Sequence, residues 1–147
     1  MMSSISSEQV HAEVEKFWRI MCGKSQERLE SLYSSNALVL TGKARKPEPA
    51  HQAMERRARQ ISAPSAEAVA ELGAIDIQIA DSRIAIASYT YKFHQKRRDQ
   101  SGEVMKRRTM FGRATQIFQQ DTGGRLRIIH EHLSAATNPE VEQSAAS

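Results

Sequence analysis

The strongest constraint on the fold of this chain is a change in the spacing of its apolar residues. Up to about residue 61, apolar residues recur at the spacing of a helix face. From about residue 74 onward they alternate with polar residues, which is typical of strands. Because helices precede a run of strands, we expect an α+β fold in which helices cover an antiparallel sheet.

Three helices are expected in the first part of the chain. The first is predicted over residues 7–22, where five apolar side chains fall on one face: Val10, Val14, Phe17, Trp18 and Met21. A short second helix is predicted at 25–33, and a third at 49–61 with Pro49 in its first turn. A short strand, Ala37–Leu40, is expected between the second and third helices.

Four further strands are expected after the helices. They are predicted over Ala74–Ala80, Arg83–Gln95, Thr109–Gln119 and Arg125–Ser134. Turn signals at 97–103 and at Asp121–Gly124 join the last three as hairpins, which predicts a meander. Residues 1–6 and 137–147 offer little to bury and are expected to be flexible tails around one domain, 7–136.

Length and composition exclude several classes of protein. The chain has 147 residues, which corresponds to one domain, and its apolar runs are too short to span a membrane. Cys22 is the single cysteine, so a disulfide scaffold is excluded. Residues 1–10 lack the basic and apolar regions of a secretory signal, and we therefore expect a cytoplasmic protein.

The positive net charge is concentrated in one segment. Residues 92–113 contain eight Lys or Arg against two acidic residues, in a chain whose net charge is +4. We expect a solvated hairpin there; the alternatives are a surface that steers an anionic small molecule or one that binds nucleic acid. Few aromatic residues are interleaved with these charges and no recognition motif is present, so nucleic acid is not the expected partner.

Three parts of the chain carry a resemblance to a known family. Asp121–Ser134 (DTGGRLRIIHEHLS), Leu29–Leu40 (LESLYSSNALVL) and the helix with Phe17 and Trp18 resemble SnoaL-like proteins of the nuclear transport factor 2-like superfamily, which includes ketosteroid isomerase. The resemblance covers about residues 8–136. It implies a cystatin-like cone, in which three N-terminal helices lie in the concave side of a curved mixed, mainly antiparallel sheet and leave a pocket open at one end.

The resemblance implies a range of activities rather than one. Members are commonly homodimers and include isomerases, dehydratases, cyclases, hydrolases and non-catalytic binding domains. Such enzymes often have an acidic residue just after the first helix or in the loop after the second. Here these places read Lys24-Ser25 and Ser34-Ser35-Asn36, so a proton shuttle of the ketosteroid isomerase type is not expected.

Two histidines are the candidate catalytic residues. His130 and His132 lie two apart on a predicted strand, which places them on one face together with Leu126, Ile128 and Ser134. The resemblance implies that this face looks into the cone. Imidazole can exchange protons near neutral pH, so the pair would serve a metal-free acid–base enzyme. The alternative is a pair of hydrogen-bonded core histidines.

A metal site and a cysteine nucleophile are not expected. The His130-x-His132 spacing is compatible with zinc, but a catalytic zinc ion usually takes three protein ligands, and only His51 is available as a third. Cys22 lies at the end of a helix with no orienting base nearby in the sequence. No cofactor is therefore predicted.

Four further residues are candidate ligand contacts. Trp18 and Tyr91 would form a pocket wall or part of the core, and the Tyr91 hydroxyl would seek a partner. Arg113 and Thr115 share one face of the penultimate predicted strand. If this face looks into the pocket, Arg113 would bind an anionic group; an outward ion pair is the alternative.

The expected function is the binding of a small organic molecule, with acid–base catalysis by the histidines if the protein is an enzyme. The alternative is a non-catalytic dimerisation or ligand-sensing module. Its self-interface would lie on the convex face of the sheet, around Ile129 and Leu133. A monomer in light scattering at micromolar concentration would count against the dimer.

Overall fold

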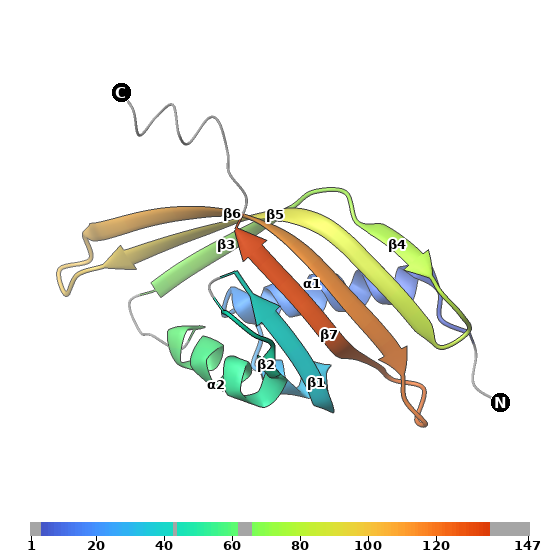
Figure 1. The fold of residues 1–147 in the computed structure, drawn as a ribbon. Coiled ribbons are helices and arrows are strands. Elements are labelled where there is room, and N and C mark those ends of the chain that lie inside the picture. Colours follow the sequence, from blue (N-terminus) through green and yellow to red (C-terminus); the bar gives the residue numbers. More distant parts are fainter. Residues whose placement is uncertain (1–3, 43, 62–65, 136–147) are drawn as a thin grey trace.

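The computed structural model describes residues 4–42, 44–61 and 66–135, which form helices on one side of a curved sheet (Figure 1). The helices are α1 (Ser7–Met21), the short 3-10 helix η1 (Leu29–Leu32) and α2 (Ala50–Ile61). The strands are β1 (Tyr33–Thr41), β2 (Glu48–Pro49), β3 (Ala66–Leu72), β4 (Asp76–Ile79), β5 (Ile84–Arg98), β6 (Val104–Gln120) and β7 (Leu126–Ala135). The α+β class predicted from the sequence is confirmed.

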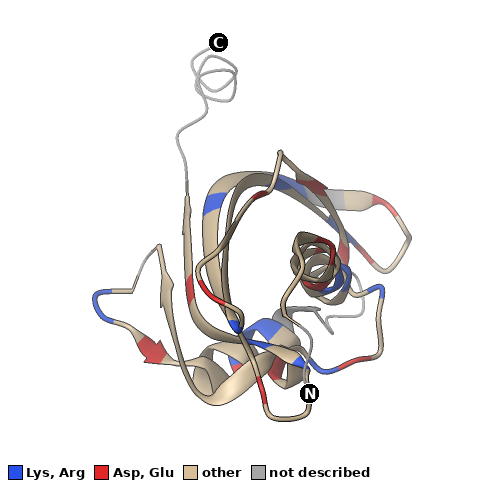
Figure 2. Ribbon diagram, turned by 90° about the vertical axis from the view of Figure 1, so that its right-hand side faces the viewer, with Lys and Arg blue, Asp and Glu red and all other residues tan. Residues whose placement is uncertain are grey.

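The sheet is mixed but mainly antiparallel. Its strand order is β2-β1-β7-β6-β5-β3, and β4 pairs with β5 as well. Successive strands from β4 to β7 pair antiparallel, which confirms the predicted meander, whereas β1 lies parallel to β7. Figure 2 shows the sheet curving around α1, and the buried residues of this concave side form one core.

The first helix begins at Ser7, and Ser6 is its N-cap. The Ser6 hydroxyl accepts from the Gln9 backbone N–H, and the Gln9 side chain accepts from the Ser6 N–H, which makes a capping box. Ile5 is buried, and its backbone N–H donates to Ser82. Ile5 and Ser6 thus belong to the folded domain, whereas the predicted tail 137–147 lies outside the described residues.

The prediction of a second helix over 25–33 is wrong. Only the four-residue 3-10 turn η1 forms there, and Tyr33 already begins β1. Leu29 and Leu32 are three residues apart, so a single 3-10 turn buries both. A longer helix would have to begin in a segment too short to offset the cost of helix nucleation.

Strand β3 was not expected from its residues. Five of its seven residues are Ala or Glu, which have low strand propensity, yet all seven residues pair with the outer half of β5. The pairing extends the sheet along the β5–β6 hairpin, which projects beyond the helices (Figure 1). This hairpin carries the basic segment, with Lys92, Lys96 and Arg107 exposed. Among the described residues, no helix is long and apolar enough to cross a membrane.

Candidate functional site

A β-bulge in β7 decides which side chains enter the interior. Ile117 of β6 lies opposite His130, whereas its neighbour Phe118 lies opposite Ile128. Ile129 is therefore an extra residue that has no partner of its own on β6. Because side chains alternate along a strand, one extra residue moves every later side chain of the strand to the opposite face of the sheet.

The prediction that His130 and His132 share the interior face with Ile128 is therefore wrong. Beyond the bulge the interior positions are those of Glu131 and Leu133, whose exposed fractions are 0% and 8%. His132 is exposed and His130 is half-buried on the outer face of the sheet. A catalytic role for the two histidines stays a prediction, and it would now need a site on that outer face.

The predicted ligand contacts divide between the two faces of the sheet. Trp18 and Tyr91 are both buried in the interior, and their ring centroids are 4.5 Å apart. Arg113 is exposed and Thr115 is half-buried on the outer face, where Thr115 lies opposite His132. The structure thus places Arg113 on the outer face and not toward the interior. Of these residues, only Trp18 and Tyr91 can line an interior site.

The residues considered for metal binding or nucleophilic chemistry do not assemble into a site. His51 is exposed on α2. Within the described ranges, no three His, Cys, Asp or Glu side chains come close enough to hold a metal ion. Cys22 is half-buried, and burial raises the pKa of its thiol, which lowers the fraction of reactive thiolate.

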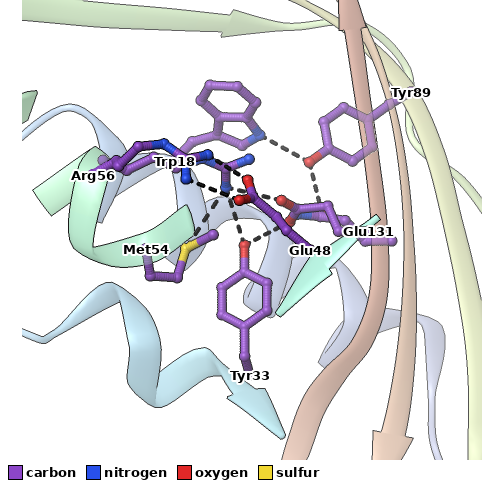
Figure 3. Close-up of polar contacts among 9 residues, drawn as sticks. Trp18, Tyr33, Glu48, Met54, Arg56, Tyr89 and Glu131 are labelled. Carbon is purple, nitrogen blue, oxygen red and sulfur yellow. Dashed lines mark hydrogen bonds and ion pairs between the residues drawn. The ribbon is translucent and has the colours of Figure 1, made fainter. Parts of the chain in front are cut away.

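Sequence reasoning missed a buried polar network, whose centre is the carboxylate of Glu131 (Figure 3). Its Oε1 accepts from Arg57 Nη1 at 2.9 Å. Its Oε2 accepts from the Tyr33 hydroxyl at 2.7 Å and from Gln116 Nε2 at 2.7 Å. Gln116 lies directly opposite Glu131 in the register of β6 and β7, so the strands themselves set this contact.

The network continues from Gln116 to the first helix. Gln116 Oε1 accepts from the Tyr89 hydroxyl at 2.8 Å, and the Tyr89 oxygen accepts from Trp18 Nε1 at 2.9 Å. Figure 3 shows the indole of Trp18 and the phenol of Tyr89 turned toward each other. Side chains from both α-helices and from β1, β5, β6 and β7 are thereby joined in one chain of hydrogen bonds.

Arg57 of α2 is the cation of the network, and one of its nitrogens is unused. Its side chain is only 11% exposed, and Nη1 contacts Glu131, the Tyr33 hydroxyl at 3.3 Å and the Met54 sulfur at 3.7 Å. Burial alone would lower the pKa of Arg57, but Glu131 and Tyr33 raise it above its ordinary value, so the guanidinium stays charged. Nη2 is buried without a hydrogen-bond partner among the described residues.

A cleft of about 440 Å³ lies beside this network, between the end of α1, η1 and α2. Apolar side chains of Ile20, Leu29, Met54 and Ala58 line part of it. Met54 belongs both to this lining and to the surroundings of Arg57. Among the residues whose side chains the structure describes, none of the basic segment 92–113 lines the cleft.

The free energy of unfolding is expected to fall as the pH rises above about 10. Burial, together with the negative charge of Glu131, raises the pKa of Tyr33 above 10.0, and burial raises that of Tyr89. Both phenols then ionise in the unfolded chain before they ionise in the folded one, which costs about 1.4 kcal/mol per pH unit for each. Urea unfolding of wild type and Tyr33→Phe between about pH 8 and pH 11 checks this. The variant should show a shallower slope; equal slopes would contradict the prediction.

Comparison with known proteins shows the fold but no close relative. No family profile and no curated protein sequence matches the chain. The solved structures similar to it include a protein of the NTF2-like family from Streptomyces avermitilis, at a TM-score of 0.75 and 16% identity, covering 89% of this chain and 97% of that one.

Two further solved structures widen the comparison. The beta subunit of the benzoate 1,2-dioxygenase from Burkholderia mallei has a TM-score of 0.73 and 14% identity, covering 92% of this chain and 93% of that one. An NTF2-like superfamily protein from Salmonella enterica has a TM-score of 0.65 and 18% identity, covering 91% of this chain and 96% of that one. The curved mixed sheet around α1 and these matches over most of both chains together show that the chain has the cone fold of NTF2-like proteins.

Proposed function

We propose that this protein binds a small organic molecule in the cleft beside α2, and that Arg57 Nη2 donates to an oxygen of that molecule. The buried Nη2 without a partner among the described residues carries the proposal. A buried donor left unpaired costs about 1–3 kcal/mol, so native structures seldom keep one without a reason. An acceptor oxygen on a ligand would remove that cost.

Arg57 is not itself among the residues that line the cleft, and the lining residue that contacts its guanidinium is Met54. It lines the cleft, and its sulfur lies 3.7 Å from Arg57 Nη1. Methionine has three rotatable bonds and adapts its shape easily. We propose that it turns aside when a ligand enters, and that Trp18 and Tyr91 limit the interior space beyond it.

The network supports binding better than it supports proton transfer. Glu131 already accepts three hydrogen bonds, one of them from a guanidinium, so its carboxylate positions Arg57 rather than serving as a free base. The structures similar to this chain include a dioxygenase subunit and NTF2-like proteins, which is compatible with a small-molecule site in this fold. Fold alone does not assign a reaction.

Arg57→Lys is expected to weaken ligand binding about tenfold or more. Lysine keeps a positive charge for Glu131 but loses the second nitrogen of the planar guanidinium. The probes are cyclohexyl methyl ketone and cyclohexanecarboxylate, followed by NMR and by fluorescence of Trp18, the only tryptophan.

The matched control for this experiment is Arg56→Met. Arg56 is the next residue on α2, and both of its terminal nitrogens donate to Glu48 at the surface (Figure 3). Its replacement should leave probe binding unchanged. The proposal is overturned if neither probe binds the wild-type protein, or if Arg57→Lys binds as tightly as wild type.

A further inference from the structure

The outer half of strand β6 has one open edge. The strand runs from Val104 to Gln120, but β7 pairs with it only as far as Gly112, which lies opposite Ala135. Residues 104–111 pair with β5 on one side, and on the other side no strand of the described residues pairs with them. A row of backbone N–H and C=O groups on this side is therefore available to an added strand.

The open edge belongs to an arm of the sheet that projects beyond the helices (Figure 1). The arm consists of β3 together with residues 91–98 of β5 and 104–111 of β6. Because β3 pairs with the other side of β5, the arm ends in β6 on one side and in β3 on the other. None of the described side chains of 92–113 lines the cleft beside α2, so a partner on this edge leaves the cleft free.

Two arginines flank the open edge, one on each face of the arm. Arg107 and Arg108 are adjacent in β6, so their side chains point to opposite faces, and both are exposed. Arg108 donates to the Met110 sulfur at 3.6 Å, and among the described residues neither arginine forms an ion pair with a carboxylate. A strand added at this edge would meet a positive charge on each of its faces.

The acidic groups of the arm do not offset these two arginines. Glu67 and Glu71 of β3 lie on the far side of β5 and form ion pairs within the arm, at 2.8 Å and 3.5 Å. In the turn between β5 and β6, the Asp99 carboxylate accepts hydrogen bonds from the turn backbone. Glu103 is exposed, but it stands at the end of the edge and not beside its middle. The field at the middle of the edge is thus positive.

Two other occupants fit this edge less well. A second copy paired through the same edge would place its arginines against these, and like charges opposite each other destabilise a strand pair. Charged side chains protect an edge from such self-pairing, but they do so only against strands of the same charge. A nucleic acid would use the charges and leave the row of backbone groups unused. An extended acidic strand uses both.

We propose that the open edge of β6, residues 104–111, binds an extended acidic segment of another protein as an added strand. The backbone groups of the edge supply the hydrogen bonds, as in other cases of strand addition. Arg107 and Arg108 select acidic side chains on the two faces of the added strand. The edge lies outside the cleft beside α2, so this proposal does not depend on the proposed function.

A peptide that alternates Thr and Val on both sides of a central Glu-Glu pair tests the proposal on the full chain. Two further forms carry N-methyl groups on alternate residues, one on the odd set and one on the even set. Because alternate N–H groups of a strand point to opposite edges, only one set would face β6.

We expect the parent peptide to bind saturably in an NMR titration. One methylated form should bind at least about tenfold more weakly than the other, because it loses the N–H groups that face the edge. Equal binding of the two methylated forms would show that charge alone holds the peptide, and would overturn the proposal. No binding of the parent peptide would overturn it as well.

Arg107→Glu tests the role of charge, and Arg113→Glu is its matched control. Arg113 is exposed on the same strand, but β7 already pairs with β6 there, opposite Ser134. It lies about 20 Å along the strand from Arg107, which exceeds the screening length of about 8 Å at 0.15 M salt. We expect Arg107→Glu to weaken peptide binding at least about fivefold and the control less than about twofold. Equal losses would overturn the proposal.

Amide hydrogen exchange shows whether the edge is open and whether the peptide closes it. The residues after Ala135 lie outside the described residues, so the full chain is measured first without peptide. We expect alternate amides of 104–111 to exchange fast and to become protected when the peptide is added. Protection of all these amides in the free protein, or binding that protects none of them, would overturn the proposal. So would a single-stranded oligonucleotide that binds more tightly than the peptide.

Discussion

Glu131→Ala is expected to lower the free energy of unfolding by about 3–5 kcal/mol. The substitution leaves the buried charge of Arg57 without its partner and removes the acceptor of Tyr33 and Gln116. Breaking a buried pair is costly because the remaining charge has neither water nor a counter-charge around it. Urea unfolding at pH 7, followed by circular dichroism, measures the change.

The neighbouring residue on β7 is the matched control for Glu131→Ala. His132 is exposed on the opposite face of the same strand, so His132→Ala should change the free energy of unfolding by no more than about 0.5 kcal/mol. A large loss in His132→Ala together with a small loss in Glu131→Ala would contradict the bulge at Ile129. The double variant Arg57→Met/Glu131→Leu should recover much of the loss, because apolar replacement of a buried pair is often close to neutral.

Gly112→Ala is expected to destabilise the protein by about 1–3 kcal/mol. A Cβ at position 112 would lie 2.1 Å from the Cζ atom of Tyr91, so the phenol ring must leave its place on β6. That ring packs at 4.5 Å from the Trp18 ring, and the displacement should therefore change the tryptophan emission spectrum as well. Urea unfolding and Trp18 fluorescence measure the two effects.

Two comparisons show whether the Tyr91 ring causes this loss. In a Tyr91→Ala background the added methyl group has room, so Gly112→Ala should cost much less there. Gly123→Ala is the second control, because its nearest neighbour would be an Asp121 oxygen at 3.5 Å, an ordinary contact. An equal cost of Gly112→Ala with and without the Tyr91 ring would contradict the proposed clash.

The parts of the fold that local patterns determine were predictable from the sequence. The apolar face of α1, the alternation in β5 and the turn residues at Asp121–Gly124 depend on neighbours within one element. The meander followed from these elements, because short turns leave adjacent strands little choice of partner. The missed strand β3 shows the limit, since its pairing with β5 overrides the low strand propensity of Ala and Glu.

The interior of the site was not predictable in the same way. If the side chains of β7 alternated regularly through Ile129, His130 and His132 would point inward and Glu131 would point outward. The bulge that reverses this depends on how β7 pairs with β6 on one side and with β1 on the other. No residue of β7 marks it, since Ile129 fits a regular strand as well as a bulged one.

Arg57, by contrast, left a signal in the sequence. Ala50, Ala53 and Met54 are buried on α2, and Arg57 follows at the next position of the same helical face. A charged residue on an apolar face requires a buried partner or a ligand. As the charged residue on an otherwise apolar face, Arg57 could have been identified from the sequence. The identity of its partner still depended on the bulge.

The most direct test of this account is one NMR titration of the folded protein with cyclohexyl methyl ketone. The side-chain guanidinium signals of Arg57 and the imidazole signals of His130 and His132 can be followed in the same sample. We predict that the Arg57 signals shift with saturation and that the histidine signals stay in place. If the two imidazole signals shifted while the Arg57 signals stayed in place, the result would contradict the proposed site. It would indicate that the ligand binds on the outer face of the sheet.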